Sequence, residues 1–114
     1  MENDWVENFD AAITVCDKEG FVVYMNDKAG EVFKDDGGKS LISKNLFDCH
    51  SPESKEKLFF MLKNNKKNVY TIEKNGVKKI IYQSPWYKDS VYSGFVELSM
   101  EIPLEMPHFV RTKE

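Results

Sequence analysis

Cys49 and His50 are neighbours in the sequence, and their side chains can bind metal ions or exchange protons. A metal site built from them would also need Cys16 and His108, and nothing in the spacing of these positions indicates that they converge. No Cys-x-x-Cys pair is present, so no structural zinc site is expected. We interpret His50 as a half-buried turn residue that could also hydrogen-bond a ligand or respond to pH.

Catalytic chemistry has no recognisable frame in this chain. Asp48 precedes Cys49 and His50 only as a sequence neighbour, and no Ser-His-Asp or Cys-His constellation has the local sequence signature of a catalytic site. Cys16 lies within a β-rich run, where a small buried hydrophobic residue is its ordinary role. We therefore predict that the protein is not an enzyme.

The first half of the chain contains the elements that must position these side chains. A glycine-closed turn at residues 17–20 joins two β-rich runs within residues 12–25. Asn26 can cap the helix that follows, and Ser51-Pro52 is typical of the start of a longer helix. The apolar spacing predicts helices over four segments: Asp4–Phe9, Asn26–Phe33, Leu41–Phe47 and Pro52–Asn64, the last with Leu58, Phe59, Met61 and Leu62 on its apolar face.

The second half of the chain reads as strands. Asn75-Gly76 favours a tight hairpin between Asn68–Lys74 and Val77–Ser84. In the last strand, Val91–Ile102, apolar residues alternate with Glu97, Ser99 and Glu101, so we expect the apolar set to face the core. The order β-β-α-α-α-β-β-β predicts an α+β fold in which one antiparallel sheet is covered by the intervening helices.

Composition limits the classes of partner. The 114 residues suffice for one domain with one core. The net charge is −3 and Arg111 is the only arginine, which argues against nucleic-acid binding. The N-terminus is acidic and no apolar run approaches ~18 residues, so we expect a cytoplasmic protein that does not engage membranes.

The order of these elements, with the residues at their corners, resembles the PAS domain family. The residues that carry the resemblance are Ile13, Val15, Asp17, Gly20, Asn26, the segment Ser43-Lys44-Asn45-Leu46, and the strand start Gly94-Phe95-Val96. The resemblance implies a five-stranded antiparallel sheet in the order 2-1-5-4-3, with helices covering one face. We expect a single domain with an N-terminal helical cap at 1–10, a core at 11–102 and a tail at 103–114.

The sequence departs from the family pattern at two positions. Ser43 stands where the family has glycine before Lys44. Pro103 follows Glu101-Ile102, where many PAS domains continue into a signalling helix, and proline blocks that helix. We therefore expect the protein to act through a separate signalling partner or through its own oligomeric state.

The resemblance also implies a pocket of on the order of a few hundred Å³ between the sheet and the helices. Haem-binding members of the family use a histidine from the long helix, so His50 is a candidate axial ligand. Flavin is not expected, because Leu46 stands where the reactive cysteine of the light-sensing members would be. Tyr70, Tyr82 and Gln83 could orient a ligand. The predicted lining residues are Phe33, Leu46, Phe47, His50, Leu58, Leu62, Tyr70, Ile72, Tyr82, Val96 and Leu98.

Two functions remain open at this point. The first is a stand-alone sensory module for signal transduction or transcription regulation that binds a small, mostly apolar ligand in its core. The second is a ligand-free homodimerisation or protein-interaction module. Its expected interface residues are Trp5, Phe9, Trp86, Tyr87 and Phe109.

Overall fold

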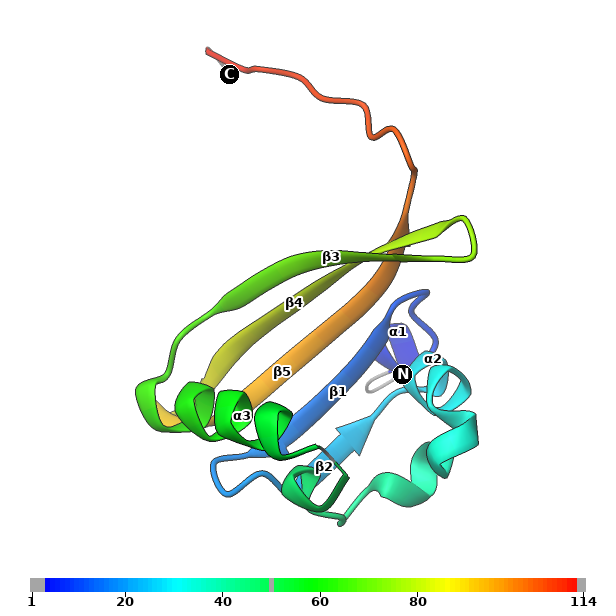
Figure 1. The fold of residues 1–114 in the computed structure, drawn as a ribbon. Coiled ribbons are helices and arrows are strands. Elements are labelled where there is room, and N and C mark those ends of the chain that lie inside the picture. The colour runs from blue at the N-terminus through cyan, green and yellow to red at the C-terminus, as the bar shows by residue number, and fades with distance from the viewer. Residues whose placement is uncertain (1–3, 50, 113–114) are drawn as a thin grey trace.

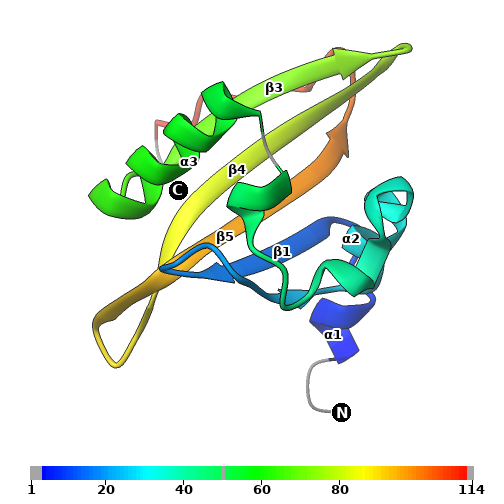
Figure 2. The same ribbon diagram turned by 60° about the horizontal axis from the view of Figure 1, so that its bottom comes forward.

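The computed structural model describes residues 4–49 and 51–112, and its centre is one five-stranded antiparallel sheet in the order β2-β1-β5-β4-β3 (Figure 1). Helical segments from the middle of the chain cover one face of the sheet (Figure 2). The predicted fold class and strand order are confirmed. The elements are α1 (Asp4–Glu7), β1 (Ala12–Asp17), β2 (Val22–Met25), α2 (Asp27–Val32), η1 (Lys34–Asp36), η2 (Gly38–Leu41), η3 (Leu46–Cys49), α3 (Pro52–Asn64), β3 (Asn68–Lys74), β4 (Val77–Lys88) and β5 (Val91–Ile102).

The turn between β1 and β2 is closed by a carboxylate and a glycine. Asp17 Oδ1 accepts hydrogen bonds from the backbone N–H groups of Glu19 (3.0 Å) and Phe21 (2.9 Å). Gly20 has φ 93°, which glycine adopts without the steric cost of a Cβ. The predicted reversal is therefore formed by local interactions.

Asn26 connects three parts of the chain from a fully buried position. Its Oδ1 accepts from the backbone N–H groups of Ile13 and Ala29, both at 3.0 Å, and its Nδ2 donates to the carbonyls of Val6 and Ala11, both at 2.9 Å. The predicted cap of α2 is thus confirmed. The same amide also fixes the start of β1 and the segment that follows α1.

The predicted helix over Leu41–Phe47 is wrong. The segment holds only the end of η2 and the start of η3, and the residues between them run beside β2. Backbone hydrogen bonds join Ser43 N to Val22 O (2.7 Å) and Val22 N to Lys44 O (2.9 Å). Pairing with an open sheet edge satisfies the backbone groups that a helix would have satisfied internally. Ser43 has φ 81°, so it adopts the left-handed conformation for which the family pattern uses glycine.

Helix α3 begins and ends close to the predicted residues. Ser51 Oγ accepts from Ser54 N at 3.3 Å and caps the helix, as expected. Leu58 and Leu62 are buried in one cluster with Cys16 and Phe95, so α3 packs against β1 and β5. The expectation that Phe59 joins the apolar face is wrong, because its side chain is exposed, whereas Leu58, Met61 and Leu62 pack against the sheet.

Gly94 allows β5 to approach β1 closely. Its φ is 142°, and a Cβ at this position would lie 2.0 Å from the carbonyl oxygen of Cys16. The register of β4 on β5 shifts between Trp86 and Tyr87, so β4 passes Pro85 and continues beyond the predicted end at Ser84. The resulting irregular corner is closed by the indole N–H of Trp86, which donates to Cys16 O at 3.0 Å.

Residues 103–112 contain no helix or strand, and they extend away from the end of β5 (Figure 1). Four large apolar side chains of this tail are exposed: Leu104, Met106, Phe109 and Val110. Among the described residues, no helix is long and apolar enough to cross a bilayer.

Replacing Asn26 tests whether its amide holds these segments together. Asn26→Ala leaves two N–H groups and two carbonyls without their buried partner, so we expect a loss of about 3 kcal/mol in the free energy of unfolding. Asn26→Asp keeps both acceptor bonds but loses both donor bonds, and it should also destabilise the fold. Urea denaturation gives the values. Asn8→Ala, which removes an exposed amide, should change stability by less than about 0.5 kcal/mol, and a similar loss in both alanine variants would contradict the assignment.

Tyr92 holds α3 against the sheet, and its ionisation gives a pH test. Its hydroxyl donates to Leu62 O at 2.7 Å, and burial raises the pKa of the phenol from the ordinary 10.0 to about 12. Because the folded-state pKa is raised, the stabilisation is complete below pH 10 and is lost as the pH approaches 12. Tyr92→Phe should lower the free energy of unfolding by about 1 kcal/mol at pH 7, and the difference from wild type should shrink above pH 10.

Urea titrations across this pH range measure that difference. Tyr82→Phe is the matched control, since Tyr82 pairs with Leu98, further along β4 and β5 from Tyr92, and its hydroxyl donates to no described residue. A wild-type minus Tyr92→Phe difference that stays constant with pH would contradict the role of the phenol.

Candidate ligand pocket

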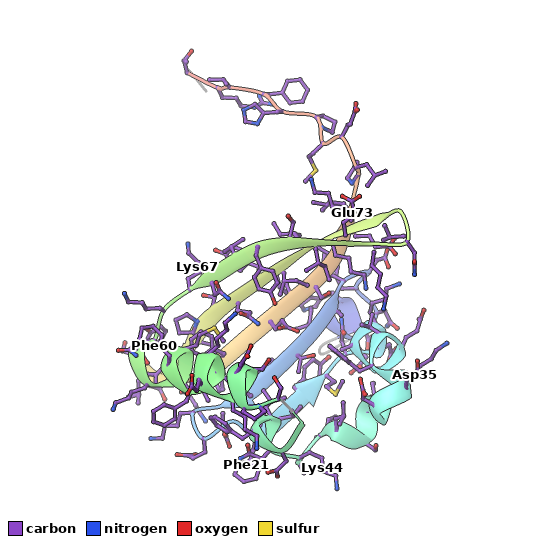
Figure 3. The ribbon with its side chains drawn as sticks, in the orientation of Figure 1. Phe21, Asp35, Lys44, Phe60, Lys67 and Glu73 are labelled. Carbon is purple, nitrogen blue, oxygen red and sulfur yellow. The ribbon has the colours of Figure 1, made fainter. Side chains whose placement is uncertain are left out.

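A cavity of about 590 Å³ lies between the sheet and the helical segments. One wall comes from the strands and the other from the chain between α2 and the middle of α3. Lys44 lies in this chain, on the segment between η2 and η3 (Figure 3). The lining residues are Thr14, Cys16, Val22, Met25, Phe33, Asp36, Leu41, Lys44, Asn45, Leu46, Leu58, Met61, Gln83, Phe95 and Glu97.

The strand register shows which face of the sheet meets the cavity. Thr14 pairs with Glu97, Glu97 with Gln83, and Gln83 with Asn68. Directly paired residues point to the same face, so these four side chains form one row across the sheet. Three of them line the cavity, which makes this the inner face. The neighbouring row, Ile13, Leu98, Tyr82 and Val69, therefore points to the outer face.

The predicted pocket positions Tyr82, Val96 and Leu98 are therefore wrong. The alternation in β5 is present as expected, but the apolar set faces outward and the set containing Glu97 faces the helices. Polar side chains can occupy the covered face because those on neighbouring strands hydrogen-bond to one another.

The inner row carries a chain of hydrogen bonds. Asn68 Nδ2 donates to Gln83 Oε1 at 2.9 Å, and Gln83 Nε2 donates to Glu97 Oε1 at 2.7 Å. Gln83, which we expected to orient a ligand, does line the cavity. This series of hydrogen bonds ends at the carboxylate of Glu97, which faces the largely apolar cavity.

The remaining predicted positions have different places in the structure. Phe33, Leu46 and Leu58 line the cavity. Phe47 and Leu62 line a separate hollow of about 290 Å³ on the other side of α3. His50 lies outside the described residues. Tyr70 and Ile72 share the inner face but are 43% and 45% exposed, because no described residue of the helical layer covers that end of β3.

Sequence reasoning missed Thr14, Cys16, Phe95 and Glu97 as lining residues. The available signal was the pairing of the first hairpin with β5. Cys16 pairs with Phe95 and Thr14 with Glu97. Because residues two apart on a strand share a face, a prediction that placed Cys16 or Phe95 inside would also have placed Glu97 inside.

Cys16 is buried and lines the cavity, and its surroundings favour the neutral thiol over the thiolate. Burial is the main cause that raises the pKa of its thiol, and the negative charges of Asp17 and Glu97 raise it further. A thiol with a raised pKa is a poor metal or haem ligand, since the thiolate is the binding form. Among the described lining residues none is a histidine, and the candidate haem ligand His50 lies outside the described residues. In the described part of the chain, no group of three or more metal-binding side chains gathers.

The predicted interface residues divide into two groups. Trp5, Phe9, Tyr87 and Phe109 are exposed. Trp86 is not, since its ring is half-buried and its N–H is bonded to the backbone of β1. Trp86 therefore stabilises the corner of the sheet.

Comparisons with solved structures identify the fold. No family model matches the chain, and no curated protein matches it. A C-terminal domain from Streptococcus mutans superposes with a TM-score of 0.70 at 22% identity, covering 87% of this chain and 81% of that one. The PAS domain of the histidine kinase ThkA gives 0.62 at 20% identity, with coverage of 79% and 97%. The Vibrio cholerae Aer2 receptor, described as a dual PAS-heme oxygen sensor, gives 0.59 at 13% identity, with coverage of 82% and 95%. This chain has the PAS fold.

Proposed function

We propose that the protein is a sensory module that binds a small, mostly apolar ligand in the cavity between the sheet and the helices. The observation that carries the proposal is the cavity itself, since its volume of about 590 Å³ lies within the usual range for small-molecule sites. Its walls combine many apolar side chains with a few polar ones, which come from β1, β4 and β5 and from the helical side at Asp36, Lys44 and Asn45. That combination is typical of sites in which apolar contacts bind the ligand and polar groups orient it.

A signal can leave the cavity through the N-terminal segment. Leu41 lines the cavity at the end of η2, and Lys39 of the same short helix bonds Glu7 of α1 at 2.8 Å and Asp27 at 2.7 Å. Asn26 ties the same region to Val6 O. A ligand that displaces η2 therefore alters the support of α1. We propose that this change is passed to a signalling partner or to a second copy of the chain, in signal transduction or transcription regulation.

Solved proteins that share the fold support this assignment only by analogy. They include a sensor histidine kinase from Vibrio cholerae and the DNA-binding receptor VqmA, of which this chain spans about half the length (56%). A fold hosts many functions, so the cavity and its lining remain the stronger argument.

Filling the cavity tests ligand binding. Thr14 lines the cavity and its hydroxyl makes no hydrogen bond with the described residues, so Thr14→Phe should occupy the space that a ligand needs. We expect compounds from a metabolite library to raise the melting temperature of the wild type, and at least tenfold weaker binding in Thr14→Phe. Thr14→Val has nearly the original volume and should bind as the wild type does. The proposal fails if no compound stabilises the wild type, or if Thr14→Phe binds as tightly as Thr14→Val.

A second candidate function is homodimerisation through the outer face of the sheet. This face carries large side chains that no described helix covers: Val69, Ile80, Tyr82, Val96, Leu98, Met100 and Ile102. The tail at 103–112 carries exposed apolar residues and points away from its own sheet (Figure 1). A twofold contact in which each tail lies on the outer face of the other copy would cover both surfaces.

Exposed phenylalanines on the two sides of the molecule provide the dimer test. Phe109→Asp places a charge in the tail, at a side chain that is 73% exposed, and should weaken the dimer at least tenfold without unfolding the chain. Phe60→Asp changes an exposed ring on α3 and should leave the dimer intact. Sedimentation equilibrium measures both. A monomeric wild type, or equal effects of the two variants, would exclude this mode of association.

A further inference from the structure

The sheet wall of the cavity carries one carboxylate, Glu97, at the middle of β5. The residue is half-buried, and β5 lies between β1 and β4 in the sheet. The opposite wall has five apolar side chains, Phe33, Leu41, Leu46, Leu58 and Met61, and three polar ones, Asp36, Lys44 and Asn45. A ligand that fills the cavity therefore meets a largely apolar wall on one side and Glu97 on the other.

The hydrogen bonds of the inner row end at Glu97, which accepts the last of them. Asn68 donates to Gln83 and Gln83 donates to Glu97 Oε1, so both amides point their donors along the row toward the carboxylate. A carboxylate only accepts hydrogen bonds, and it can accept several. Its second oxygen, Oε2, receives no hydrogen bond from any described residue.

No cation of the described chain neutralises Glu97. Over residues 4–49 and 51–112, ion pairs join Lys28 to Asp10, and Lys39 to Glu7 and Asp27. Lys44 lines the same cavity but forms no ion pair with Glu97. Cys16 and Tyr70 have raised pKa values, for which burial is the largest cause and the negative charge of Glu97 a further one.

An unpaired carboxylate in an apolar cavity selects for one kind of ligand. A positively charged N–H donor gains a charge-assisted hydrogen bond there, and it also relieves the desolvation of the carboxylate. A ligand carboxylate or phosphate brings like charge to Glu97 and is repelled. A neutral hydroxyl gains a weaker hydrogen bond and leaves the charge unpaired.

We propose that the cavity selects small apolar molecules that carry a protonated amine or amidine, and that Glu97 accepts the N–H donors of this group. This inference rests on the proposed function, because it requires that the cavity binds a ligand. It adds the chemical class of the ligand and the residue that selects it. Gln83 has a positioning role, since its hydrogen bond holds the Glu97 side chain against the sheet.

Three probes with one apolar body test the selectivity on the unaltered protein. Naphthylmethylamine, naphthylmethanol and naphthoate differ in the charge of the head group and share the ring system. We expect the amine to bind about tenfold more tightly than the alcohol, which corresponds to about 1.4 kcal/mol, and naphthoate to bind most weakly. Isothermal titration calorimetry measures the dissociation constants, and amide chemical-shift changes at Thr14 and Phe95 place the bound probe in the cavity.

A pair of matched variants assigns the preference to one residue. Glu97→Gln keeps an oxygen that can accept from Gln83 but removes the charge, so the preference for the amine over the alcohol should disappear. Glu101→Gln is the control. Glu101 lies on the same face of β5, four residues after Glu97, but it is exposed and does not line the cavity. It should keep the wild-type preference.

The outcomes separate this inference from the proposed function. If the alcohol or naphthoate binds in the cavity as tightly as the amine, or if Glu97→Gln retains the preference, the ligand class is wrong and ligand binding stands. If none of the three probes binds and no library compound stabilises the wild type, both the ligand class and the proposed function fail.

Discussion

The buried amide of Asn26 is the constraint on which the arrangement of this protein depends. Its side chain uses both acceptor and both donor positions, and its four partners belong to α1, the segment between α1 and β1, β1 and α2. Because the group is wholly buried, each of these bonds replaces one that water would otherwise provide. One residue therefore sets where the first strand begins, where the helical layer starts and where α1 lies.

The cavity follows from the way the helical layer is attached. Its first part is held by Asn26 and by backbone pairing of Ser43 and Lys44 with β2. Its last part is held by Leu58 and Leu62 on the sheet and by the hydroxyl of Tyr92. The residues between these attachments span the sheet without filling the space beneath them, and the two buried clusters lie on either side of that space.

The inner face of the sheet explains why the cavity is polar on one side. Alternation along β5 places Glu97 and Ser99 on the face that the helices cover, together with Gln83 from β4. Gln83 donates a hydrogen bond to Glu97 across the two strands, which satisfies part of its hydrogen-bonding capacity on the covered face, and Glu97 lines the cavity. The apolar set of the same strand faces outward, where it offers a surface for association.

Local signals in the sequence determined most of the architecture. The glycine-closed turn, the caps at Asn26 and Ser51 and the Asn75-Gly76 hairpin act between neighbouring residues, so each could be recognised without knowledge of the fold. Predictions that depended on distant contacts were less successful. The segment 41–47 was predicted as a helix because its spacing is helical, whereas the open edge of β2 recruits its backbone.

Only the tertiary structure decided which face of the sheet lines the cavity. The two-residue alternation along a strand indicates that successive side chains lie on opposite faces, but it does not indicate which face the helices cover. That choice depends on the path of the chain from α2 to α3, which is fixed by contacts between residues far apart in the sequence. For this reason the sequence pattern specified the strands, the family resemblance implied their order in the sheet, and the folded chain alone placed Glu97 inside and Leu98 outside.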